Sequence, residues 1–220
     1  MLKLFKYLKT SILSILIIIA LLVCQASLDL ALPDYTSKII NVGIQQNGIE
    51  DAVANVISSS TFDELSIFLN EDEVKIIDNS YDLVKQKDKK YIEEYPIVNE
   101  EDIYVYNGKN KEEVNAVLEH AFALSYVSQM ISSNPASLGI NIPEGMTFQN
   151  VLAMLDEDTR SEVIAKIDEK IEEMPDTILT SSAIEYVKSE YEKVGVDLGS
   201  IQANYILING AKMLGIALLI

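Results

Sequence analysis

Apolar residues gather at the two ends of the chain, whereas the stretch between them mixes apolar and charged positions. The run from Ile12 to Leu32 is almost wholly apolar and long enough, as a helix, to cross about 30 Å of hydrocarbon. Apolar residues at helical spacing continue to Gln46, although Pro33 interrupts the run. Because proline removes a backbone hydrogen bond, the pattern predicts a kinked membrane helix with an outer extension over residues 11–46.

Two shorter segments lie at the ends of the sequence, one before this helix and one at the C-terminal end. Residues 1–10 separate lysines from apolar side chains, as an amphipathic elbow segment in the cytoplasmic headgroup layer would. Lysines before the membrane helix and none within it predict a cytoplasmic N-terminus. Residues 200–220 become wholly apolar only from Met213, which predicts the truncated start of a second membrane helix. We therefore expect the sequence to be part of a longer chain.

The N-terminal run has two other interpretations. A cleaved signal peptide would combine the basic start with an apolar core over Ile12–Val23 and a cleavage site near Ala26. A lipoprotein anchor would use Cys24, the only cysteine, but Val23 stands where such signals carry a small residue. We interpret Cys24 as a small apolar helix residue and expect the segment to be retained.

A few polar side chains lie on one side of the predicted membrane helix. At about 100° per residue, Ser11, Ser14, Gln25 and Asp29 fall within about 60° of one another. Ionisable groups at membrane depth usually face other helices or a wet cavity, so the stripe indicates a helix with protein neighbours. The alternative is that Asp29 sits in the outer headgroup layer.

The middle of the chain, residues 47–199, is predicted to be one acidic domain. Of the 34 acidic and 17 basic residues, 32 and 12 respectively lie between Glu50 and Asp197, so this stretch carries about −20 of charge. About 150 residues is an ordinary size for a single domain. Such a charge argues against binding to a nucleic-acid backbone, which needs many lysines and arginines.

Helical spacing dominates this middle stretch, so the predicted fold class is mainly α. We expect helices over Phe62–Leu69, Glu71–Val84, Lys111–Ser132, Thr147–Leu155, Thr159–Glu173 and Ile178–Val194. The last helix should end at Gly195. Ile103–Tyr106 is the only predicted strand, and Ser133–Gly145, with its prolines and glycines, is predicted to be a loop.

The sequence offers no set of catalytic, cofactor-binding or metal-binding residues. His120, the only histidine, lies at core spacing and is interpreted as structural; it has no second nitrogen or sulfur ligand for zinc. The stretch from Asp156 is similar to a calcium loop, but Ser161 and Ile167 replace its glycine and its glutamate. Paired carboxylates are interpreted as solvated surface. The chain also lacks the G-x-x-x-x-G-K-[ST] phosphate loop.

One motif carries a resemblance to a known family. The stretch from Leu30 to Val53 matches a P-D-Y-[TS]-S-x-I-[IV]-N-x-G-I pattern at Pro33, Asp34, Tyr35, Ser37, Ile39, Asn41, Gly43 and Ile44. It resembles the outer end of the first membrane helix in ABC exporters of the type I fold, closest to the heterodimeric multidrug or peptide exporters of Firmicutes. Residues 174–197 and 203–220 resemble the exit of a large extracytoplasmic insert and the start of the second helix in one subgroup.

The resemblance implies the N-terminal part of an ATP-driven exporter subunit. Such a protein is a multi-pass protein of the cell membrane, with a second subunit as its heterodimer partner and an unidentified exported substrate. ATP and Mg would be bound by domains outside this segment. Ser14, Gln25 and Asp29 would then contribute to the transport pathway or to helix packing, and Pro33, Asp34, Tyr35, Ser37, Asn41 and Gly43 would form the family motif and the helix kink.

A second function class also fits two membrane helices around an external domain. Two-span receptors of the sensor-kinase or chemoreceptor type carry an extracytoplasmic ligand-binding domain in the same position. Four further membrane spans and a phosphate loop beyond Ile220 would favour the exporter, whereas a short coiled signalling helix would favour the receptor.

Overall fold

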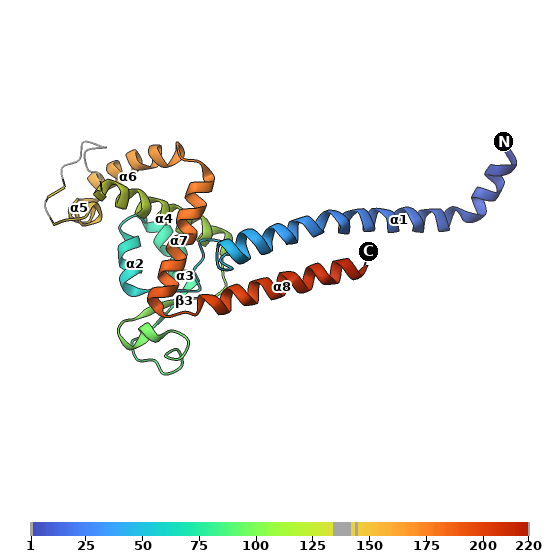
Figure 1. Ribbon diagram of the computed structural model, residues 1–220. Helices are drawn as coiled ribbons and strands as arrows, with labels where there is room; N and C mark the ends of the chain where they lie inside the picture. Colours follow the sequence, from blue (N-terminus) through green and yellow to red (C-terminus); the bar gives the residue numbers. More distant parts are fainter. Residues whose placement is uncertain (1, 134–141, 144, 220) are drawn as a thin grey trace. The chain divides into compact units, whose positions relative to one another are not determined.

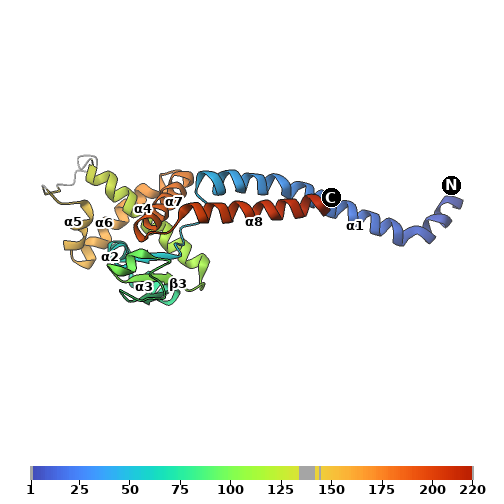
Figure 2. The same ribbon diagram turned by 60° about the horizontal axis from the view of Figure 1, so that its bottom comes forward.

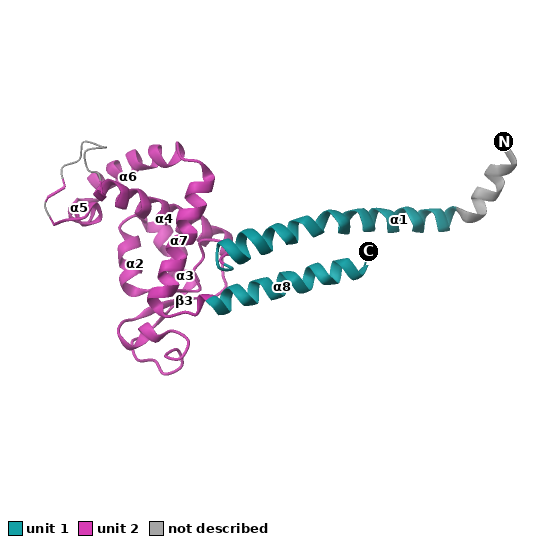
Figure 3. Cartoon of the chain, viewed as in Figure 1, with its two compact units in different colours: residues 1–48, 199–220 teal, residues 49–198 magenta. Residues whose placement is uncertain are grey.

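The computed structural model describes residues 2–133, 142–143 and 145–219, with side chains from residue 12 onward. The chain forms two compact units (Figure 3). Unit 1 consists of residues 1–48 and 199–220, and unit 2 consists of residues 49–198. Unit 2 lies within two residues, at each end, of the range 47–199 that the charge pattern assigns to the acidic domain.

Unit 1 is a pair of helices. α1 (Leu2–Lys38) continues into a short π-helix, η1 (Ile39–Gln45), and α8 (Leu198–Leu219) runs back alongside in the opposite direction (Figures 1 and 2). Among the described residues, only the stretch Ile12–Gln45 is long and apolar enough to cross a membrane. Its side chains are almost entirely exposed. The second membrane helix over residues 200–220 stays a prediction, and the side chains of the elbow segment, residues 1–10, lie outside the described part.

The helix type changes at Ile39, six residues after Pro33. α1 continues through Pro33 to Lys38, and the wider π-helical turns begin at Ile39. The backbone N–H of Gln46 reaches the carbonyl of Asn41 at 3.2 Å, five residues earlier. A single missing hydrogen bond does not end a long helix, so α1 runs through Pro33, and the kink expected at that residue stays a prediction.

Glycines set how closely η1 approaches α8. A Cβ atom added to Gly43 would lie 2.8 Å from Cγ1 of Ile206. Gly48, which follows η1, has φ of +81°, and an added Cβ would lie 3.0 Å from the Ile201 carbonyl. The side-chain amide of Gln202 donates to the Gly43 carbonyl at 3.0 Å. Because glycine has no side chain, Gly43 permits close packing of η1 on α8, and Gly48 permits the left-handed turn that follows.

Unit 2 surrounds a small antiparallel sheet with helices. The strands are β1 (Val56–Ser58), β2 (Tyr81–Val84) and β3 (Ile103–Tyr106), in the order β1-β3-β2. The helices are α2 (Ser59–Ser66), α3 (Glu71–Ser80), the 3-10 helix η2 (Pro96–Asn99), α4 (Lys111–Ser133), α5 (Phe148–Met154), α6 (Glu157–Glu172) and α7 (Asp176–Val194). The mainly α fold class is confirmed.

Local capping chemistry explains where several helices begin and end. Thr147 accepts the N–H of Asn150 and caps α5, as predicted, and Asp156 caps α6 by accepting the N–H of Thr159. Gly195 ends α7 in the left-handed region at φ of +85°. Ser58 caps α2, so that helix begins at Ser59, three residues before the predicted start. These caps satisfy backbone groups that a helix end leaves free.

The prediction of one strand and of a helix through Val84 is wrong. α3 ends at Ser80, and β2 then pairs with β3, with Tyr81 opposite Tyr106 and Val84 opposite Ile103. Tyr81 lies at helical spacing from the apolar residues of α3, which favoured a longer helix, but the pairing across the sheet decides its conformation. β1 is only three residues long and fully buried, so it shows no alternating pattern.

The helical core of unit 2 lies around α4. Residues from α4, α5 and α6 form one buried apolar cluster together with Phe68: Ala123, Leu124, Val127, Ile131, Phe148, Leu152, Ile167 and Ile171. α4 also packs against α7, where the rings of Phe122 and Tyr186 stack 4.3 Å apart. The predicted loop Ser133–Gly145 falls largely outside the described residues.

Candidate functional site

A shallow groove on unit 1 brings together several residues singled out from the sequence. Asp29, Pro33, Ser37 and Asn41 line it at intervals of four residues, so one helix face presents them all. The groove has a volume of about 640 Å³. It brings Asp29 of the predicted polar stripe together with Pro33, Ser37 and Asn41 of the P-D-Y motif, which the sequence analysis describes as separate features.

The hydrogen bonds of this groove leave its carboxylate free. The amide of Asn41 donates to the hydroxyl of Ser37 at 3.0 Å, and the hydroxyl of Thr36 donates to the carbonyl of Leu32, also at 3.0 Å. Within the described part of the chain, nothing pairs with Asp29, which is exposed. The groove therefore combines an unpaired carboxylate with apolar side chains such as Leu32 and Ile40, and no hydrogen bond within the described residues covers that carboxylate.

The other predicted residues of α1 and η1 lie elsewhere. Ser14 and Gln25 are exposed on α1 and do not line the groove, and Asp34 is also exposed. Tyr35 is partly covered. Gly43 is buried against Ile206 of α8, so its place in the motif has a packing reason.

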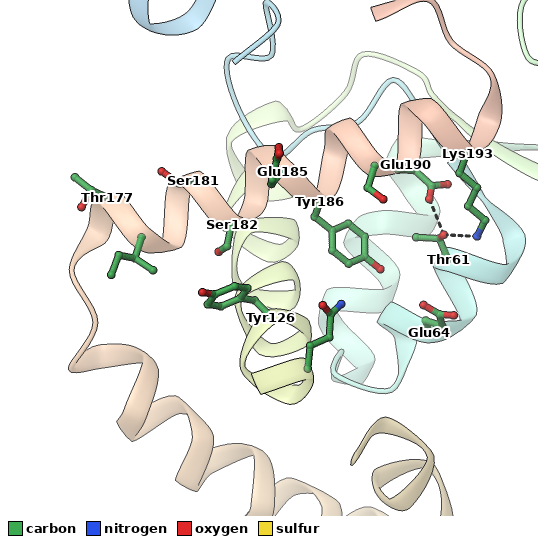
Figure 4. Close-up of a pocket in the computed structure, with 13 residues that line it drawn as sticks. Thr61, Glu64, Tyr126, Thr177, Ser181, Ser182, Glu185, Tyr186, Glu190 and Lys193 are labelled. Carbon is green, nitrogen blue, oxygen red and sulfur yellow. Dashed lines mark hydrogen bonds between the residues drawn. The ribbon is translucent and has the colours of Figure 1, made fainter. Parts of the chain in front are cut away.

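Unit 2 contains a larger pocket that no motif in the sequence indicates. This pocket, of about 820 Å³, lies between α7, α4 and α2 (Figure 4). α7 contributes residues at intervals of four, including Ser182, Tyr186 and Glu190, while Tyr126 comes from α4. A row of small hydroxyl residues on α7 is the only local signal of it, because the other walls come from distant parts of the chain.

A buried carboxylate holds one end of this pocket together. Glu190 is only 4% exposed and accepts the backbone N–H of Ser58 and the hydroxyl of Thr61, each at 2.6 Å. The ammonium of Lys193 donates to the hydroxyls of Thr61 and Ser60 at 2.7 and 2.8 Å. A buried carboxylate needs such donors, and they tie α7 to the start of α2 (Figure 4).

A second carboxylate binds the same serine-rich segment from the other side. Glu101 accepts the hydroxyl of Ser59 at 3.0 Å and both the N–H and the hydroxyl of Ser60, at 2.8 and 3.0 Å. Burial alone would raise the pKa of Glu101, but these donors and the charge of Lys193 outweigh it and hold the pKa below its ordinary value.

Tyr186 stands at the centre of the pocket. One ring face stacks on Phe122, and burial, followed by the negative charges of Glu64 and Glu190, raises the pKa of Tyr186 well above its ordinary value. Tyr126 is 37% exposed and lies across the pocket from α7. The pocket therefore combines two aromatic rings with a negative electrostatic environment.

His120 joins two helices of unit 2. Its Nε2 lies 2.8 Å from a carboxylate oxygen of Asp168, which connects α4 to α6, and its side chain is partly exposed. This contact between side chains agrees with a structural role. Among the described residues no group of three or more histidine, cysteine, aspartate or glutamate side chains is arranged to hold a metal ion.

Comparison with known proteins adds no relative to this description. No family model, curated protein or solved structure gives a significant match to the chain.

Proposed function

We propose that this chain is the N-terminal transmembrane and extracytoplasmic portion of an ATP-driven ABC exporter subunit. In this proposal α1 with η1 is the first membrane helix, α8 starts the second, and unit 2 is the domain inserted between them outside the cell. ATP and Mg would bind to other domains of the transporter, since this sequence has no phosphate loop.

The observation that carries the proposal is the exposed, unpaired carboxylate of Asp29 in a groove on a helix of membrane length. Asp29, Ser37 and Asn41 share one face of a segment whose surroundings are otherwise apolar. A carboxylate facing lipid is unfavourable, so a membrane helix with this face needs further helices or a wet pathway beside it. Exporters of this fold surround their first helix with other spans.

The packing of α8 on η1 supports the same proposal. Gly43, a residue of the family motif, allows Ile206 to pack directly on the backbone. The hydroxyl of Thr36 also reaches the sulfur of Met213 at 3.8 Å, farther along the pair. Small residues at such crossings are typical of membrane helix pairs, and adjacent first and second helices are what an exporter would have.

ATP hydrolysis by the natural polypeptide that carries this sequence tests the proposal. Purified in lipid nanodiscs with its partner subunit, it should hydrolyse ATP with a requirement for Mg, and replacement of Asp29 by alanine should change the response of that rate to transported substrates. A polypeptide that instead transfers phosphate from ATP to one of its own histidines, without continuous hydrolysis, would identify a receptor kinase and contradict the proposal.

A further inference from the structure

The pocket of unit 2 has the size and lining of a ligand site. Its volume of about 820 Å³ lies within the range of small-molecule pockets, about 300–1,000 Å³. Tyr126, Ile178 and the ring of Tyr186 supply apolar surface, while carboxylates and hydroxyls supply polar contacts. The site lies wholly inside unit 2, so it does not depend on the function proposed for the membrane helices.

The pairing of the charged groups shows which of them is left for a ligand. Glu190 and Lys193 are both engaged with the hydroxyls of the α2 start. Glu185 accepts from the ammonium of Lys188 at 3.1 Å. Glu64, by contrast, has no partner in the described part of the chain and lines the pocket from α2. One carboxylate is therefore available on the wall that faces Tyr186.

The surroundings favour a cation over an anion at this position. Burial and, after it, the negative charges of Glu64 and Glu190 raise the pKa of Tyr186, so both carboxylates lie near its hydroxyl. The stretch that contains unit 2 carries about −20 of charge, which concentrates cations near its surface. Three carboxylates, those of Glu64, Glu185 and Glu190, line the pocket against one lysine, Lys193, so the lining as a whole is negative and attracts a cation more than an anion.

The aromatic rings of the pocket are a second reason to expect a cationic ligand. Tyr126 and Tyr186 enter the pocket from α4 and α7 (Figure 4). Because Tyr186 is held against Phe122, its orientation is fixed before a ligand arrives. Tyrosine faces attract ammonium groups, and an aliphatic chain gains from burial against Tyr126 and Ile178.

We propose that this pocket binds an alkylammonium group, with the nitrogen at Glu64 and Tyr186 and the aliphatic chain against Tyr126 and Ile178. Both a free amine and a lysine side chain of a peptide carry this group. The hydroxyls of Ser182 and Thr177 also line the pocket, where they can form hydrogen bonds with polar groups of the ligand beyond its aliphatic chain.

Ligand-observed NMR on the full chain in nanodiscs tests the proposal. The probes are hexylamine and its neutral analogue hexanol, together with an acetylated and amidated leucine-lysine tetrapeptide and the same peptide with acetyl-lysine. We expect hexylamine to bind at least about fivefold more tightly than hexanol, and the Glu64→Gln variant to lose about that factor, as an ion pair of about 1 kcal/mol would give.

A matched variant separates the site from the general charge. Asp63→Asn removes one negative charge from the same helix, but Asp63 does not line the pocket, so its hexylamine affinity should stay within about twofold of the unaltered chain. Binding of the lysine peptide in addition to hexylamine would identify a peptide ligand, and binding of hexylamine alone would identify a free amine. Equal affinities for hexylamine and hexanol, or equal losses in the two variants, would overturn the proposal.

Discussion

Glu190 is the side chain that attaches α7 to the start of α2. It accepts the N–H of Ser58 and the hydroxyl of Thr61 in a site from which water is almost excluded. A buried donor that loses its acceptor keeps the full penalty of its desolvation. The geometry therefore makes this carboxylate matter more to unit 2 than its exposed neighbours do.

Replacement of Glu190 by glutamine should lower the free energy of unfolding of unit 2 by about 1–3 kcal/mol, because the amide directs N–H groups at donors. Urea denaturation followed by circular dichroism measures this. Glu192→Gln is the control, since Glu192 is exposed on the same helix, and it should change stability by less than about 0.5 kcal/mol. Equal effects of the two substitutions would show that the buried contacts contribute little.

Glu101 should make part of the stability of unit 2 depend on pH. Its pKa is lower in the folded state than the ordinary value of about 4.3, so its contribution is complete above that value and is lost as the pH falls through the folded pKa. Glu101→Gln should therefore be less stable than the unaltered chain near pH 7, with the difference shrinking below about pH 4. Unfolding by urea at several pH values tests this, with Glu100→Gln as control. A difference that stays constant with pH would contradict the assignment.

At the scale of elements, the α1–α8 pair rests on one close approach at Gly43 and a contact farther along the helices. In a Cys24→Ala background, cysteines placed at Thr36 and Met213 should form a disulfide under mild oxidation, whereas cysteines at Thr36 and Leu214 should not. In the natural chain the hydroxyl oxygen of Thr36 lies 3.8 Å from the sulfur of Met213, whereas the side chain of Leu214 is exposed. Cleavage of the chain within unit 2 followed by electrophoresis shows whether the disulfide holds the fragments together.

The same cross-link reports on the glycine. Gly43→Val should reduce the yield of the Thr36–Met213 disulfide severalfold, because an added Cβ would overlap Ile206 and overpacking destabilises by about 1–3 kcal/mol. Gly210→Val is the matched control, since an added Cβ there meets no atom within 4 Å. An unchanged yield in Gly43→Val would mean that the helices do not pack closely at this residue.

The elements that the sequence predicted well are those specified by neighbouring residues. Thr147 at the start of α5 and Gly195 at the end of α7 act within one turn of their helices, whereas the cap at Asp156, which starts α6 two residues before the predicted Thr159, was not foreseen. The sheet needs pairing between residues far apart, such as Val56 with Val105, and its strands are too short to show their period. The pocket of unit 2 is equally hard to predict from the sequence, because its walls come from three helices that are far apart along the chain.

The whole chain divides into an apolar helix pair and a strongly acidic domain. Helical periodicity alone places Asp29, Pro33 and Ser37 on one face of the helix, so the sequence predicts their alignment but not the groove itself. In the proposed function the groove faces other membrane helices, and no pattern within this sequence identifies them. The central claim is that unit 2 lies outside the cell while the N-terminus lies inside.

Labelling from outside the cell tests that claim most directly. A cysteine placed at Lys89, an exposed position of unit 2, in a Cys24→Ala background reports on the side of the membrane. The account predicts reaction with a membrane-impermeant maleimide in intact cells, to the same extent as after lysis, and no reaction in the background chain. Reaction only after lysis would place unit 2 in the cytoplasm and contradict the account.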